Sequence, residues 1–119
     1  MERTLYASAA RTATPTAVTV RTGRYRGIKL FINVSALAAT PSVVPKIEMV
    51  DSLSGAVSAA LLTGAAITAT GVTVLTVYPG VTVAANVSAA DVLPDAIKVT
   101  MTHGDADSIT YSVAAHLIP

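Results

Sequence analysis

Residues 93–118, LPDAIKVTMTHGDADSITYSVAAHLI, decide the fold class of this chain, because they hold two alternating segments joined by a turn. Ile97, Val99 and Met101 alternate with polar residues, and the same period of two returns over residues 109–115. Successive side chains of a strand point to opposite faces, so each segment is a strand with one apolar face. The Gly and Asp residues between them favour a tight reversal. The pattern therefore predicts an antiparallel β-hairpin.

An isolated hairpin is at best marginally stable in water, so its apolar face needs a second layer of strands. Residues 56–67, AVSAALLTGAAI, are ambiguous: Ala and Leu favour a helix, whereas Gly64 and the neighbouring strands favour a strand, which we predict. The run VTVLTVY at residues 72–78 is rich in β-branched residues and bounded by turn residues, and it predicts a buried central strand. Other strands are predicted at residues 17–22, 26–37 and 43–51. The whole predicts an all-β fold, an antiparallel β-sandwich or jelly roll of about seven to eight strands.

The N-terminal segment, residues 1–15, has a weaker pattern. Residues 4–8 could pair in a sheet, but the Ala/Thr/Arg stretch that ends at Pro15 has no clear period. We predict an extended N-terminal arm or an edge strand, of the kind that often orders on contact with a partner. Because 119 residues suit one domain, residues 16–119 are predicted to form a single β-sandwich domain.

Charge is scarce and unevenly placed along the chain. Charged residues make up 13% of the sequence, against about 25% in average soluble domains. This low charge indicates surface shared with other subunits. Residues 1–30 hold six basic residues and one acid, a net charge of +5, and the remainder carries −4. The basic segment predicts contact with an acidic partner surface, or alternatively a solvated edge that discourages aggregation.

Nucleic acid and membranes are poor partners for this sequence. The basic residues have only Tyr25 and Phe31 nearby and lack a recognised nucleic-acid-binding motif. Every apolar run is interrupted well before the roughly 18 residues that a membrane span needs. We therefore expect neither nucleic acid nor membrane as a partner.

No pattern in the chain indicates catalysis. His103, Asp105 and Asp107 could bind a divalent cation, but their spacing matches neither a calcium loop nor a zinc signature. Aspartates in a tight turn more often accept hydrogen bonds from their own backbone amides. Asp91 and Asp95 could suggest a glycosidase pair, yet they lack an aromatic platform for a sugar. We expect no enzymatic activity, catalytic residue, cofactor, metal site or small-molecule substrate.

Three segments carry a family resemblance: ATPSVV, AAITATGVTVLTVYPG and LPDAIKVTMTHGDADSITYSVAAHLI. They resemble segments of small structural proteins encoded with the head genes of tailed bacteriophages, and the likeness covers residues 26–118. Within that group the chain is most similar to a capsid decoration, or cement, protein. The resemblance implies a small homotrimeric β domain that sits on the outside of the head and bridges major capsid protein subunits.

The expected role follows from this resemblance and from the charge pattern. We expect a virion protein of the outer capsid surface, made in the host cytoplasm, that binds the major capsid protein and its own copies. Deletion of residues 1–14 is expected to abolish binding to heads without unfolding the sandwich. Two alternatives are a phage tail or head-to-tail connector structural protein and a host-surface or glycan-binding module. The expected contacts to capsid carboxylates are Arg3, Arg11, Arg21, Arg24 and Arg26.

Overall fold

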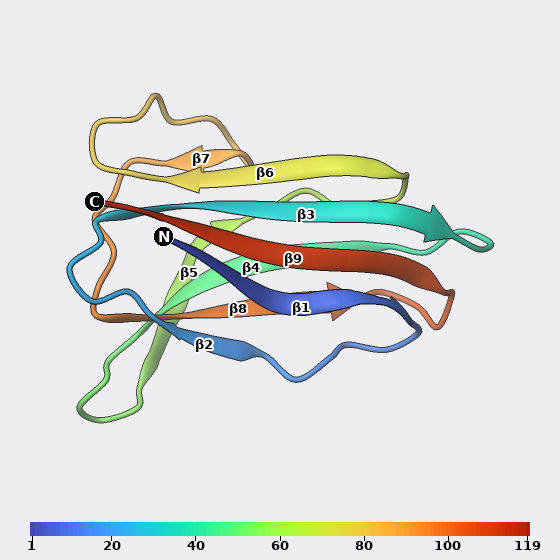
Figure 1. Ribbon diagram of the computed structural model, residues 1–119, viewed down its shortest axis with the longest axis horizontal. Helices are drawn as coiled ribbons and strands as arrows, with labels where there is room; N and C mark the ends of the chain where they lie inside the picture. The colour runs from blue at the N-terminus through green and yellow to red at the C-terminus, as the bar shows by residue number, and fades with distance from the viewer.

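The computed structural model describes residues 1–119 as nine strands without a helix, arranged in two sheets (Figure 1). No helix long and apolar enough to cross a membrane is present. The strands are β1 (Glu2–Arg11), β2 (Val18–Arg21), β3 (Gly27–Leu37), β4 (Val43–Val50), β5 (Val57–Thr63), β6 (Gly71–Val77), β7 (Ser88–Ala89), β8 (Ala96–His103) and β9 (Ile109–Ile118).

The two sheets share one core in a sandwich-like arrangement. One sheet has the strand order β1-β9-β3-β6-β7 and the other has the order β2-β8-β4-β5. Ile28, Leu30 and Ile32 of β3 are fully buried, as the alternation in that segment predicts. Burial of each such side chain stabilises the fold by about 1.5–3 kcal/mol. The prediction of an all-β fold with two sheets is thus confirmed.

The predicted hairpin over residues 93–118 is wrong, although both of its strands are present. β8 pairs with β2 and β4, whereas β9 pairs with β1 and β3. Residues 104–108 carry the chain from one sheet to the other, so the two strands face each other across the core (Figure 1). The alternation specifies which side chains point inward, but a hairpin and a crossover between sheets satisfy it equally well.

The last strands of the sheets depart from the sequence prediction in three ways. Residues 57–63 form a strand, β5, so the predicted strand is confirmed over part of its range. β6 is not a buried central strand, because Val72 is 61% exposed and only the two-residue β7 lies beyond it. β7 raises the count to nine strands, and its pairing with β6 is parallel rather than antiparallel.

The N-terminal residues form an edge strand in this structure. β1 pairs with β9 over its length, with two irregularities in register, and Tyr6 is buried in the core. The backbone N–H of Leu117 donates to the carbonyl of Met1 at 2.7 Å. Removal of residues 1–14 would therefore strip a sheet edge as well as charge, which makes point substitutions the sharper test of binding.

Candidate interaction surface

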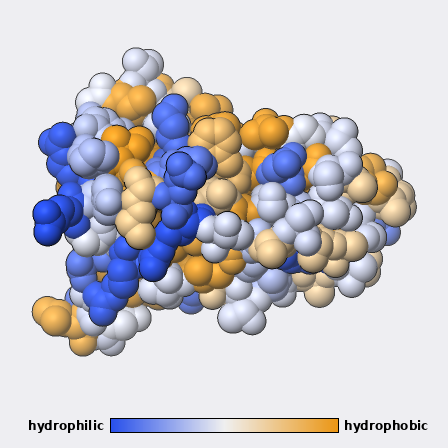
Figure 2. Space-filling model, viewed as in Figure 1, coloured by the Kyte–Doolittle hydropathy of each residue, from blue (hydrophilic) through white to orange (hydrophobic).

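Four of the five arginines predicted to contact a capsid lie at one end of the sandwich. Arg3 lies opposite the C-terminal part of β9, and Arg21 lies opposite the start of β8. Arg24 and Arg26 belong to the connection between β2 and β3 at the same end. This end also holds both chain termini, and hydrophilic residues crowd it (Figures 1 and 2). We call it the arginine end.

The connections at the arginine end are fixed to one another by hydrogen bonds. The buried Thr22 donates its hydroxyl to the carbonyl of Pro94 and its N–H to the carbonyl of Asp95, the latter at 2.9 Å. The N–H of Leu93 donates to the carbonyl of Arg26 at 3.0 Å. The arginines are therefore carried on an ordered scaffold rather than on loose loops.

Two of these four arginines already have partners within the chain. The Arg21 guanidinium lies 2.7 Å from the Asp95 carboxylate, although both side chains are more than half exposed. The Arg26 guanidinium donates to the hydroxyl of Tyr78 at 3.0 Å. Arg3 and Arg24 are exposed and form no salt bridge. They are the two arginines of this end without a hydrogen-bonded side-chain partner, and the exposed Lys29 of β3 adds a third cation without a salt bridge.

Arg11 lies at the opposite end and is folded back onto the sheet. Its guanidinium donates to the carbonyl oxygens of Tyr111 and Ala7, both at 2.7 Å, and of Ala9 at 3.2 Å. It also stacks over the Tyr111 ring, 4.5 Å from the ring centroid. Arg11 therefore holds β1 on β9, and its donors are largely used inside the chain. The sequence could not reveal this role, because Tyr111 is a hundred residues away.

Tyr111 is the centre of a buried polar cluster next to Arg11. Its hydroxyl lies 3.0 Å from Nε2 of His103, and burial raises the pKa of Tyr111 to about 12. Burial, together with the nearby Arg11 charge, lowers the pKa of His103. The hydroxyl of Tyr6 donates to the carbonyl of Thr16 at 2.7 Å. The contact between Tyr111 and His103 joins β9 to β8 across the core.

The turn after β8 uses its aspartates for local structure. Asp105 accepts a hydrogen bond from the N–H of Asp107 at 3.1 Å. Asp107 in turn accepts from the N–H of Thr40 at 3.2 Å, which ties the turn to the connection after β3. Asp105 thus accepts from its own turn as predicted, whereas Asp107 accepts from a distant segment. The structure contains no group of three or more His, Cys, Asp or Glu side chains that could hold a metal ion.

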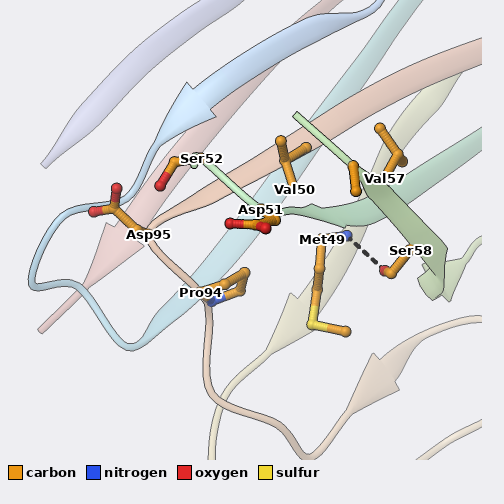
Figure 3. Close-up of a pocket in the computed structure, with 9 residues that line it drawn as sticks. Met49, Val50, Asp51, Ser52, Val57, Ser58, Pro94 and Asp95 are labelled. Carbon is orange, nitrogen blue, oxygen red and sulfur yellow. Dashed lines mark hydrogen bonds between the residues drawn. The ribbon is translucent and has the colours of Figure 1, made fainter. Parts of the chain in front are cut away.

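A shallow depression of about 460 Å³ lies between the β4–β5 hairpin and the Pro94 loop (Figure 3). The carboxylate of Asp51 accepts hydrogen bonds from Ser54 and Leu53, and these bonds lower its pKa. Asp95 is held by Arg21. Since both carboxylates are engaged, the depression suits an apolar side chain better than a reaction. Its apolar lining comes from Met49, Val50, Ala56, Val57 and Pro94.

Comparison of this chain with protein-family models, with curated proteins and with solved structures found no match. The features of this chain that bear on its function are the placement of charge and apolar surface in the structure and the resemblance of the sequence segments.

Proposed function

We propose that this protein is a structural virion protein that binds the outside of a tailed-phage capsid and stabilises it by bridging major capsid protein subunits. It would be made in the host cytoplasm, assemble as a homotrimer and reside on the outer surface of the capsid. The observation that carries the proposal is the pair of exposed, unpaired arginines, Arg3 and Arg24, at the arginine end. The segments over residues 26–118 that resemble phage head proteins support it.

The proposed mechanism is binding by area and by repetition rather than by a single strong contact. An exposed ion pair contributes only about 0.2–1 kcal/mol, so two arginines per copy give weak attachment. Linked copies bind with avidity, because the first contact raises the effective concentration of the next to the millimolar range. A ring of three copies would join capsid subunits that one copy could not span.

We also infer that the two sheets form a jelly roll. With β7 set aside, each sheet contributes four strands in the orders β1-β9-β3-β6 and β2-β8-β4-β5. The chain changes sheet between β1 and β2, β2 and β3, β3 and β4, β5 and β6, β7 and β8, and β8 and β9. Jelly rolls of eight strands occur in viral capsid domains. This likeness concerns the fold alone and adds to the proposal only by analogy.

The experiment that tests the proposal is cosedimentation with phage heads that lack the protein. The variant Arg3→Glu/Arg24→Glu reverses the charge of both arginines and should lose binding, because it would face capsid carboxylates with like charge. Lys98→Glu, on the outer face of β8, is the matched control and should sediment with heads as the wild type does. Unchanged sedimentation of the double variant would overturn the arginine hypothesis.

A second measurement separates the head from the tail. Gold-labelled antibody against the protein should decorate the outside of the heads in electron micrographs. Label confined to the tail or to the head-tail junction would instead identify a tail or connector protein, and the capsid proposal would fail.

A further inference from the structure

Residues 52–90 contain no charged side chain. At the 13% charged content of the whole chain, 39 residues would hold about five charges. The region includes β5, β6 and β7 with their connections. We call residues 52–90 the uncharged flank.

The topology brings the uncharged flank together. β5 is the last strand of the four-stranded sheet, and β6 and β7 are the last strands of the other sheet. A Cβ atom placed on Gly64, just after β5, would lie 3.3 Å from the Leu75 side chain of β6. β6 and β7 follow the upper margin of the molecule in Figure 1. The ends of both sheets thus meet on the same side of the sandwich.

The uncharged flank exposes apolar side chains. Five of the eight large apolar residues that are exposed belong to it, although it holds a third of the chain. A shallow groove of about 360 Å³ runs beside β6, with Val72 and Val87 in its lining. The five exposed residues are Leu53, Val57, Val72, Val83 and Val87.

The flank also leaves two strand edges open. β5 pairs only with β4, and β7 pairs with β6 only at Thr76 and Val77, so residues 71–75 of β6 have no neighbour on that side. Neither β5 nor β6 contains a charge or a proline. Native proteins usually protect open edges with charges, prolines or bulges. The β1 edge has charged residues and two irregularities in register, whereas the β5 edge has two irregularities in register but no charge.

We propose that the uncharged flank packs against the uncharged flanks of other copies of this chain, around a common rotation axis. A charged surface that meets its own copy brings like charges close together, which costs electrostatic energy. An uncharged surface can meet its own copy without that cost. A strongly charged partner would lose hydration here without gaining a counter-charge. The flank is therefore electrostatically matched to itself. This inference rests on the self-association in the proposed function and assigns its contact surface.

The proposed interface leaves the arginine end free. β6 and β7 run along the long axis of the molecule, and the arginine end lies at one end of that axis (Figure 1). A rotation axis along the strands would place the arginine ends of all copies at the same pole. The self-association surface and the proposed capsid-binding surface would then be separate.

The test is the mass of the protein in solution, measured by light scattering after size exclusion at about 50 µM. Val72→Lys and Val87→Lys each place a cation on the flank. The side chains that they replace are 61% exposed at Val72 and 52% exposed at Val87. Val92→Lys is the matched control, because Val92 is 50% exposed and lies outside the flank. We expect an oligomer for the wild type and the control, and a monomer with an unchanged circular dichroism spectrum for both flank variants.

Two results would overturn the inference: a wild-type protein that is monomeric at 50 µM, or flank variants that keep the wild-type oligomer mass. The inference would also be overturned if the association constant fell less than tenfold in both flank variants. Because the measurement uses no phage heads, its failure leaves the capsid proposal to its own cosedimentation test.

Discussion

Arg11 fastens the first strand to the sheet, and its removal gives the most direct test of the structure. Arg11→Ala deletes three hydrogen bonds to carbonyl oxygens and the stacking of the guanidinium over Tyr111. Hydrogen bonds to charged groups contribute about 1.5–3 kcal/mol each when buried, but these carbonyls can regain water once the edge is exposed. Stacking of an exposed cation on a ring adds about 0.5–1 kcal/mol. We expect a net loss of roughly 2 kcal/mol, a large share of the 5–15 kcal/mol that stabilises a typical domain.

The assay is urea unfolding followed by far-ultraviolet circular dichroism at one fixed protein concentration. Arg11→Lys keeps the charge but loses the planar fork that reaches several carbonyls, so its midpoint should lie between those of Arg11→Ala and the wild type. Arg24→Ala removes an exposed arginine without a salt bridge and should leave the midpoint unchanged. An Arg11→Ala protein with the wild-type midpoint and slope would refute the proposed role of this side chain.

Three further predictions concern stability. The pKa of Tyr111 is about 12 in the fold against about 10 in the unfolded chain. The contribution of this shift to the free energy of unfolding is therefore complete below pH 10 and is lost as pH rises towards 12. Tyr111→Phe should remove this part of the pH dependence in urea titrations. Since burial lowers the pKa of His103, the unfolded chain takes up the proton first, so stability should fall as pH drops below 6.5, and His103→Gln should flatten that fall. Gly27→Ala would place a Cβ atom 2.7 Å from the carbonyl oxygen of Val77 and should cost about 1–3 kcal/mol, measured as a lower thermal midpoint.

The sequence predicts side-chain faces well but strand partners poorly. In β3 and in β9 the alternating apolar residues are the buried ones, because burial depends only on the local period of two. Pairing depends on which backbones meet, and the five residues between β8 and β9 allow either a tight hairpin or a crossover between sheets. β8 and β9 each have one apolar face. Because the strands lie in opposite sheets, these two faces point toward each other and fill one core.

The same limit explains the misplaced central strand. The run VTVLTVY suggests burial on both faces, yet Val72 lies on an open edge with more than half of its surface exposed. Hydrophobicity in a strand cannot distinguish side chains covered by the chain itself from those left for a second copy. The informative signal is the absence of charge over residues 52–90, which extends far beyond any one strand.

Charge along the chain and charge in space lead to different expectations for binding. The net charge of +5 over residues 1–30 suggests a strongly basic segment, but Asp95 from the far end of the sequence neutralises Arg21, and Arg11 is turned inward. The exposed positive charge that remains is small, and salt at physiological strength screens it within about 8 Å. Attachment to an acidic surface should therefore weaken only modestly with salt for a monomeric flank variant, and more steeply for an assembled ring, which presents several copies of that charge. A steep salt dependence shared by both would indicate that charge rather than repeated contact area holds the protein on its partner.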